Sequence, residues 1–170
     1  HTVVVTAGAN QKRGETRLSL LGRNAMVVES IVRELDEHAP QARIVIATNP
    51  VDVLTRVAIE VSKRPAHRIF GTGTTLDSAR LRALLGDAHA VSPKAVHAHV
   101  LGEHGDSQVV FWSGANVGGV LLGELEAGPT FDDAFRKRIE DDVRGAASAI
   151  IAGKGYTNLA IGVVIASLVD

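Results

Sequence analysis

The first half of the chain alternates buried-type strands with helices, and this order restricts the fold more than any other feature. Apolar runs predict strands over 2–7, 43–48 and 68–71. Helices over 17–38 and 51–62 are predicted between them, the first with Leu, Ala and Val spaced three and four apart on one face. This order predicts a parallel sheet covered by helices, with ligands at the carboxyl ends of its strands.

The second half has a different pattern, in which short strands are set among helices. We expect a helix over 76–85 with Thr75 as its N-cap, strands over 95–101 and 107–112, and helices over about 131–152 and from 159 onward. A stretch rich in glycine and threonine begins near Thr72 and predicts a boundary there. The sequence therefore predicts two parts, 1–71 and 72–170.

Composition excludes several classes of function. The net charge of -1 gives no electrostatic footprint for nucleic acid, and the absence of cysteine excludes thiol catalysis and disulfides. The apolar runs are shorter than the ~18 residues that a membrane span needs, so we expect no membrane partner. The absence of cysteine fits a reducing compartment, and we expect a cytoplasmic protein. The chain opens with His1 directly on a strand and stops at Asp170 within a helical stretch, so we expect an internal piece of a longer protein.

A histidine in a glycine turn is the first candidate for chemistry. His104 lies between Gly102 and Gly105, with Glu103 and Asp106 close by, and predicted strands flank the turn. A turn of this kind presents an imidazole at a strand end, where small-molecule sites collect. The local pattern alone favours a surface histidine in a polar turn over a functional one.

Asp77 and Arg80 are three residues apart on a predicted helix, so their side chains project from one face. Such a pair is commonly a solvated ion pair. Leu81, Leu84 and Leu85 lie on or beside the same face, however, which places the pair near a core or cleft. There an aspartate can orient a histidine, and an arginine can bind a carboxylate through two hydrogen bonds.

Three further features leave alternatives open. The polar loop over 9–17 follows a strand end and is either a lid or a solvated loop. Asn49, before Pro50, either caps the next helix or faces a ligand. His97 and His99 alternate along a strand, but no acidic ligand is in register with them and His104, so we expect no metal site.

Five blocks of sequence together resemble the L-lactate/malate dehydrogenase family, and its bacterial lactate-specific members most closely. The blocks are TAGANQKxGETR (6–17), NPVD (49–52), GTGTxLDSAR (71–80), GEHGDS (102–107) and GYT (155–157). The family's N-terminal nucleotide-binding βαβ and the end of its catalytic domain are absent. The resemblance implies the C-terminal part of a Rossmann-type parallel sheet domain (1–71), followed by the α+β catalytic domain (72–170), both incomplete.

The resemblance also implies an activity: reversible hydride transfer between L-lactate and NAD, giving pyruvate and NADH. His104 would be the proton acceptor and donor, and Asp77 would hold its tautomer and stabilise the imidazolium. Arg80 would bind the substrate carboxylate, and Arg17 would polarise the carbonyl after loop closure. These roles agree with the chemistry, because the cofactor transfers the hydride while the protein supplies orientation, a proton and charge stabilisation.

The remaining site residues follow from the same resemblance. Asn49 and Thr157 would contact the substrate, and the cofactor contacts would be Gly8, Ala9, Ser30, Ala47, Thr48, Asn49 and Thr72. Gln11 occupies the position that sets substrate choice, where an arginine would pair the second carboxylate of oxaloacetate. A neutral glutamine favours pyruvate, although the basic Arg13 nearby complicates this interpretation.

Arg82 and His97 match two basic positions through which many bacterial relatives bind fructose 1,6-bisphosphate between subunits, and the resemblance implies a homotetramer. The alternative is that both are ordinary surface residues with no ligand. Within the same chemistry, the alternative is a malate or branched-chain L-2-hydroxyacid dehydrogenase. The alternative from another class is a non-catalytic module that keeps the fold, because part of the cofactor site lies outside this sequence.

Overall fold

The computed structural model describes residues 1–9, 17–155 and 157–170. They form two compact units, residues 1–73 and residues 74–168, and each has its own apolar core. None of the helices in the described part of the chain has the length and apolar character that a membrane crossing requires.

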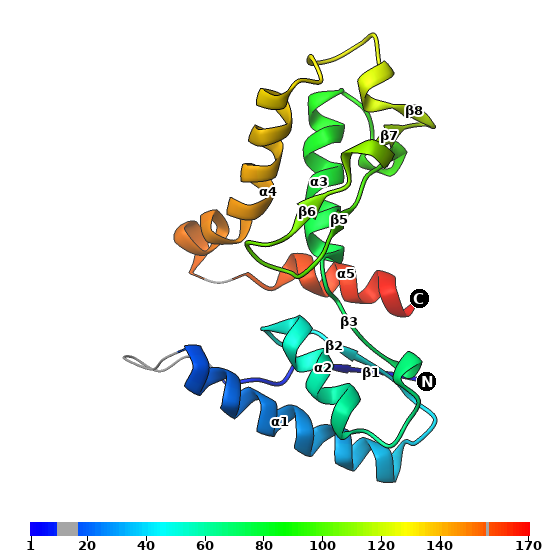
Figure 1. The fold of residues 1–170 in the computed structure, drawn as a ribbon, viewed down its shortest axis with the longest axis vertical. Helices are drawn as coiled ribbons and strands as arrows, with labels where there is room; N and C mark the ends of the chain where they lie inside the picture. The colour runs from blue at the N-terminus through cyan, green and yellow to red at the C-terminus, as the bar shows by residue number, and fades with distance from the viewer. Residues whose placement is uncertain (10–16, 156) are drawn as a thin grey trace. The chain divides into compact units, whose positions relative to one another are not determined.

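The first unit is a parallel sheet with two covering helices (Figure 1). Its strands lie in the order β1 (Thr2–Val5), β2 (Arg43–Ile46) and β3 (Ile69–Gly71), and α1 (Arg17–His38) and α2 (Val51–Val61) connect them. Both helices lie on the same face of the sheet, as right-handed crossovers between successive neighbouring strands require. The predicted parallel sheet is confirmed, although β1 and β2 end two residues earlier than expected.

The core of this unit explains the spacing of apolar residues along α1. Val28 and Val32 are fully buried, and Leu21, Ala25 and Leu35 of the same face pack against the core. Opposite them lie the apolar side chains of the sheet and of α2, namely Val5, Ile44, Ile46, Val51, Leu54, Ala58 and Ile69. Burial of this face fixes α1 against the sheet.

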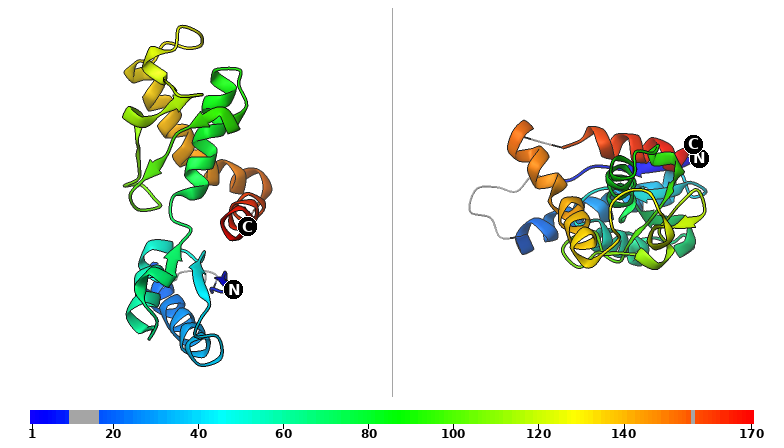
Figure 2. Two further views of the ribbon diagram at one scale, coloured as in Figure 1. Left: turned by 90° about the vertical axis from the view of Figure 1, so that its right-hand side faces the viewer. Right: turned by 90° about the horizontal axis from the view of Figure 1, so that it is seen from above.

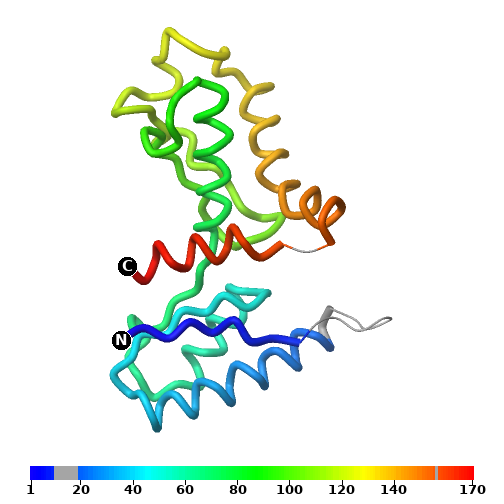
Figure 3. Tube along the Cα trace, turned by 180° about the vertical axis from the view of Figure 1, so that it is seen from behind, coloured from blue at the N-terminus to red at the C-terminus, as the bar shows by residue number. Residues whose placement is uncertain are grey.

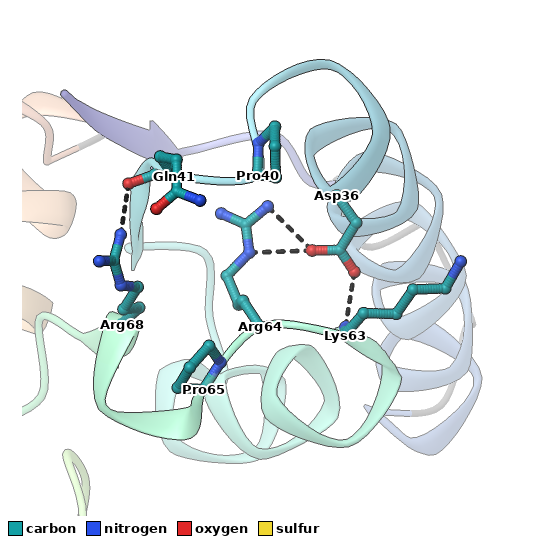
Figure 4. A pocket seen from close by; sticks show the side chains of 7 residues that line it. All are labelled: Asp36, Pro40, Gln41, Lys63, Arg64, Pro65 and Arg68. Atoms are coloured by element: carbon teal, nitrogen blue, oxygen red, sulfur yellow. Dashed lines mark hydrogen bonds and ion pairs between the residues drawn. The ribbon is translucent and has the colours of Figure 1, made fainter.

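A buried ion pair between Asp36 and Arg64 lies at the C-terminal end of α1. Nε and Nη2 of Arg64 both lie 2.9 Å from Oδ1 of Asp36, and Nη1 donates to the Ala42 carbonyl at 2.8 Å. Figure 4 shows the pair at the wall of a hollow of about 330 Å³, with the backbone N–H of Lys63 donating to the same carboxylate. Burial raises the pKa of Asp36, but hydrogen bonds from Lys63, Ser62 and Arg64 and the charge of Arg64 outweigh it, so the pKa lies below 3.8.

This pair predicts an acid-sensitive contribution to stability. The folded pKa of Asp36 lies below the unfolded value of 3.8, so its contribution is complete above pH 3.8 and is lost as the pH falls through the folded pKa. Asp36→Asn should lower the free energy of unfolding at pH 7 by about 3–5 kcal/mol, because Arg64 stays buried without its partner. Urea unfolding at pH 3 to 7 measures both effects.

The matched control is Glu29→Gln, which removes one member of the exposed pair between Glu29 and Arg33 on the same helix. An exposed pair of this kind contributes less than about 1 kcal/mol. Equal losses in Asp36→Asn and Glu29→Gln would contradict the stabilising role given to the buried pair.

The second unit packs α3 (Thr75–Ala88) against α4 (Asp133–Lys154), and the trace in Figure 3 shows the two helices side by side. Two small antiparallel sheets lie beside α3 (Figure 2): β4 (Val96–His97), β7 (Asn116–Val117) and β8 (Val120–Leu121) in one, and β5 (Val100–Leu101) and β6 (Val109–Val110) in the other. The remaining elements are α5 (Leu159–Val169) and short 3-10 turns at Ala66–Arg68, Pro93–Ala95, Trp112–Gly114 and Leu122–Glu124.

Several predicted boundaries in this unit are wrong. The single strand expected over 95–101 is two strands in different sheets. The hairpin of β7 and β8 was not predicted, although Gly118 and Gly119 between apolar residues are typical of a tight turn. The N-cap of α3 is Thr74 rather than Thr75, so the helix begins one residue earlier than expected.

Candidate active site

The turn that carries His104 joins β5 to β6, so the histidine stands at the end of a two-stranded hairpin. Gly102 has a φ of +89°, a backbone conformation that residues with a Cβ rarely adopt, and it begins the turn. The His104 side chain is 29% exposed, so its ring is partly covered. Glu103, its neighbour, accepts a hydrogen bond from the Ser107 hydroxyl.

Asp77 is the hydrogen-bond partner of His104. It lies in the first turn of α3, where a carboxylate is favoured by the helix dipole, and only 3% of its side chain is exposed. Its Oδ2 lies 2.6 Å from Nδ1 of His104. Because a carboxylate can only accept, Nδ1 carries the proton, which leaves Nε2 as the nitrogen that gains and loses one.

Arg80 lies one helical turn beyond Asp77 and faces its other oxygen. Nη1 of Arg80 is 3.5 Å from Oδ1 of Asp77, and the arginine side chain is 13% exposed. Each oxygen of the Asp77 carboxylate therefore has a partner: the N–H of His104 at Oδ2 and the guanidinium of Arg80 at Oδ1. The guanidinium keeps further donors in the planar arrangement that suits a carboxylate ligand. An imidazole held by a carboxylate, beside an arginine that can bind a carboxylate ligand, suits chemistry on a small hydroxy or oxo acid.

In the first unit, hydrogen bonds organise the loops at the carboxyl ends of the strands. The Thr48 hydroxyl donates to the Ala7 carbonyl at 2.8 Å. The Ala9 N–H donates to Oδ1 of Asn24 at 2.7 Å, and Nδ2 of Asn24 donates to the Asn49 carbonyl at 3.2 Å. Asn24 of α1, which is 3% exposed, thus ties the loop after β1 to the loop after β2.

A hollow of about 470 Å³ opens beside these loops on α1. It is lined by Ala9, Arg23, Met26, Val27, Ser30 and Ile31, so its wall is mostly apolar. The apolar wall suits a flat aromatic base, and the polar strand ends suit a polar linker. A nicotinamide dinucleotide has both parts. Two of the predicted cofactor contacts, Ala9 and Ser30, line this hollow.

The other residues predicted to contact the cofactor lie at the ends of the strands. Gly8, Ala47 and Thr48 lie at the strand ends just described, and Thr72 follows β3, its N–H donating to the Ile46 carbonyl. Asn49 is exposed, and the alternative in which it caps α2 is wrong, because the N-cap is Pro50 and no side chain caps that helix. Arg17 begins α1.

The remaining predicted residues are spread over the chain. Gln11 lies outside the described residues. Thr157 is partly buried and lies between α4 and α5. Arg82 of α3 donates to the Ala98 carbonyl at 3.4 Å, and His97 is exposed in β4. No group of three or more His, Cys, Asp or Glu in the described ranges is arranged to hold a metal ion.

The sequence did not lead us to Asn24 and Ser78, whose side chains hydrogen-bond the backbone of segments in the candidate site. Ser78 is 5% exposed and bonds the backbone of Val100, two residues before the His104 turn begins. Both are polar residues on helical faces that are otherwise apolar. Asn24 lies between Leu21 and Val28 on α1, and Ser78 lies before Leu81 on α3. A polar residue on a face that must be buried is the signal that identifies them.

Comparison with known proteins gives two family matches that together span the chain. Residues 1–71 match the model of the lactate/malate dehydrogenase NAD binding domain, and residues 74–170 match that of the lactate/malate dehydrogenase alpha/beta C-terminal domain. The chain is 52% identical to an L-lactate dehydrogenase of Salinibacter ruber and 50% identical to one of Thermus aquaticus. In each case the match covers 98% of this chain and 54% of the relative.

Solved structures agree with these matches. A lactate dehydrogenase from a Medee basin deep-sea metagenome library has a TM-score of 0.90 at 40% identity, over 96% of this chain and 52% of that one. A minor L-lactate dehydrogenase of Enterococcus mundtii has a TM-score of 0.89 at 41% identity, over the same shares. The chain spans about half the length of these relatives. It belongs to the lactate/malate dehydrogenase family.

Proposed function

We propose that the whole protein is an NAD-dependent L-lactate dehydrogenase whose proton-transfer pair is His104 and Asp77. The observation that carries the proposal is the 2.6 Å hydrogen bond from Nδ1 of His104 to the buried carboxylate of Asp77. This bond fixes the ring orientation, and we assign the transferred proton to Nε2. The family matches and the lactate dehydrogenase relatives support the assignment.

In this proposal His104 takes the proton of the lactate 2-hydroxyl at Nε2 and returns it when pyruvate is reduced. Asp77 keeps Nδ1 protonated and stabilises the imidazolium that forms. Arg80 binds the substrate carboxylate through two parallel hydrogen bonds, and its contact with Asp77 supports this role beside the proton-transfer pair. Arg17 polarises the carbonyl, and Thr157 lines the substrate pocket.

Residues 1–71 are proposed as the second half of the NAD-binding domain, and residues 72–170 as the catalytic domain. The cofactor would be held by Gly8, Ala9, Ser30, Ala47, Thr48, Asn49 and Thr72. Bound NAD supplies the hydride acceptor. Asn24 supports these cofactor-binding residues indirectly, because its amide fixes the backbone at Ala9 and at Asn49. Asn49 would contact both the cofactor and the substrate.

Initial rates of NADH oxidation by the whole protein test the proposal. We expect pyruvate to be reduced faster than oxaloacetate or a branched-chain 2-oxoacid at equal concentrations. Fluorescence titration with NADH tests the non-catalytic alternative, which predicts neither saturable binding nor turnover. A preference for oxaloacetate would instead identify a malate dehydrogenase.

Gln11 is proposed to set this preference. Gln11→Arg should shift the ratio of kcat/KM for pyruvate to that for oxaloacetate by about a hundredfold toward oxaloacetate, because the new guanidinium pairs the second carboxylate. Gln11→Asn is the matched control, since it changes the side chain without adding charge, and should leave the ratio within about threefold. An unchanged ratio in Gln11→Arg would show that Gln11 does not choose the substrate.

We also propose that the whole protein is a cytoplasmic homotetramer that binds fructose 1,6-bisphosphate through Arg82 and His97. A guanidinium and a protonatable imidazole suit a phosphate ligand. Arg82 already contacts the Ala98 carbonyl, next in sequence to His97. A ligand that engaged both side chains would therefore act on the strand segment that leads to the His104 turn.

A further inference from the structure

Val100 is a buried residue whose backbone groups face away from their sheet. It lies in β5, opposite Val110 of β6, and is 1% exposed. The Phe111 N–H donates to the His99 carbonyl at 2.9 Å, so residues 99 and 111 form a hydrogen-bonded pair. Hydrogen-bonded and non-hydrogen-bonded pairs alternate in an antiparallel ladder. The N–H and C=O of Val100 therefore point away from β6 and need other partners.

Two hydroxyl groups from the start of α3 provide those partners. The Val100 N–H donates to Oγ of Ser78 at 2.9 Å, and the Ser78 hydroxyl lies 3.4 Å from the Val100 carbonyl. The Thr74 hydroxyl donates to the same carbonyl at 2.6 Å. Thr74 is the N-cap of α3, yet its side chain makes no capping bond to the helix. Both hydroxyls are thus committed to a single residue of β5.

This contact joins the two segments that carry the proton-transfer pair. Asp77 lies between Thr74 and Ser78 in sequence, and Val100 lies four residues before His104. The turn itself is largely exposed, so its position depends on how its two ends are held. At the other end, Gln108 is 4% exposed, and its carbonyl accepts a hydrogen bond from Arg144 of α4 at 3.2 Å.

We infer that Ser78 and Thr74 are positioning residues that hold the His104 turn in register with Asp77 through the backbone of Val100. A shift of β5 along α3 would move His104 relative to a carboxylate that is fixed in the helix. A bond of 2.6 Å tolerates little displacement, and proton transfer is sensitive to small errors in position. The effect on turnover rests on the proposed function, whereas the effect on the hydrogen bond between His104 and Asp77 does not.

The test uses the whole protein and two matched pairs of variants. Ser78→Ala and Thr74→Val remove a hydroxyl, while Ser78→Thr and Thr74→Ser keep one. Thr74→Val preserves the shape of the side chain and so remains informative if Ser78→Ala fails to fold. Ile139→Val is the stability control, because it trims the core of the same unit without touching the turn.

Two readouts separate positioning from a purely structural role. We expect kcat for pyruvate to fall about ten- to a hundredfold in Ser78→Ala and Thr74→Val, with the Kd for NADH unchanged. By proton NMR, the downfield signal of the His104 Nδ1 proton should weaken or move upfield in the same variants. The two hydroxyl-retaining variants and Ile139→Val should keep kcat within about threefold and retain the signal.

A lower melting temperature in Ser78→Ala and Thr74→Val, with kcat and the ring-proton signal both unchanged, would overturn the inference. The NMR readout does not require turnover. If the wild-type protein did not reduce pyruvate while the ring-proton signal still depended on the two hydroxyls, the proposed function would fail and the positioning role would stand.

Discussion

Replacing His104 with asparagine is expected to lower the rate of pyruvate reduction by as much as about 10⁴-fold while NADH binding stays nearly intact. The asparagine amide still reaches toward Asp77 and preserves the shape of the turn, but it has no proton that titrates near neutral pH. The variant therefore isolates proton transfer from the positioning of the turn. Initial rates from NADH absorbance measure the loss, and fluorescence titration measures cofactor binding.

The matched control is His99→Asn, which alters an exposed histidine just before β5 that has no proposed role in proton transfer. That variant should keep kcat within about twofold of the wild type, as expected for a surface substitution. Turnover by His104→Asn within tenfold of the wild type would contradict the assigned role. So would an equal loss of activity in the two variants.

Replacing Asp77 with asparagine should lower kcat by about 10³–10⁴-fold, because the amide neither stabilises an imidazolium nor fixes the tautomer of His104. An asparagine Nδ2 can donate to Nδ1, which leaves the proton on Nε2 in the neutral ring and prevents it from accepting the substrate proton.

Asp106→Asn provides the comparison, since Asp106 is an exposed acid two residues after His104. It should leave kcat and KM nearly unchanged. A kcat of Asp77→Asn close to that of the wild type, in a protein that melts at the wild-type temperature, would show that the 2.6 Å contact has no part in catalysis.

The sequence predicted the architecture well where the pattern repeats over many residues. The spacing of Val28 and Val32 along 17–38 and the apolar runs at 43–48 predicted α1 and β2, because burial of one face dictates both patterns. Strands of two residues, such as β7 and β8, have no repeat to detect. The break between β4 and β5 was not predicted for the same reason, since a strand that passes from one sheet to another leaves no periodic signal.

Contacts between distant residues were harder to predict. His104 and Asp77 are 27 residues apart, and the local pattern favoured a surface histidine until the family resemblance paired the two residues. Arg64 and Asp36 are 28 residues apart, and nothing in either neighbourhood predicts that both charges are buried together. Such pairs depend on tertiary packing, which fixes partners that local propensity does not specify.

The most direct test of the central claim is the oxidation of separate lactate enantiomers by the whole protein with NAD, followed by NADH absorbance. A proton acceptor at His104, a carboxylate anchor at Arg80 and a hydride acceptor on a fixed side define three points, and only one hand of a 2-hydroxy acid satisfies all three. The account predicts NADH formation with L-lactate and little or none with D-lactate. Equal oxidation of the two enantiomers, or none of either, would contradict it.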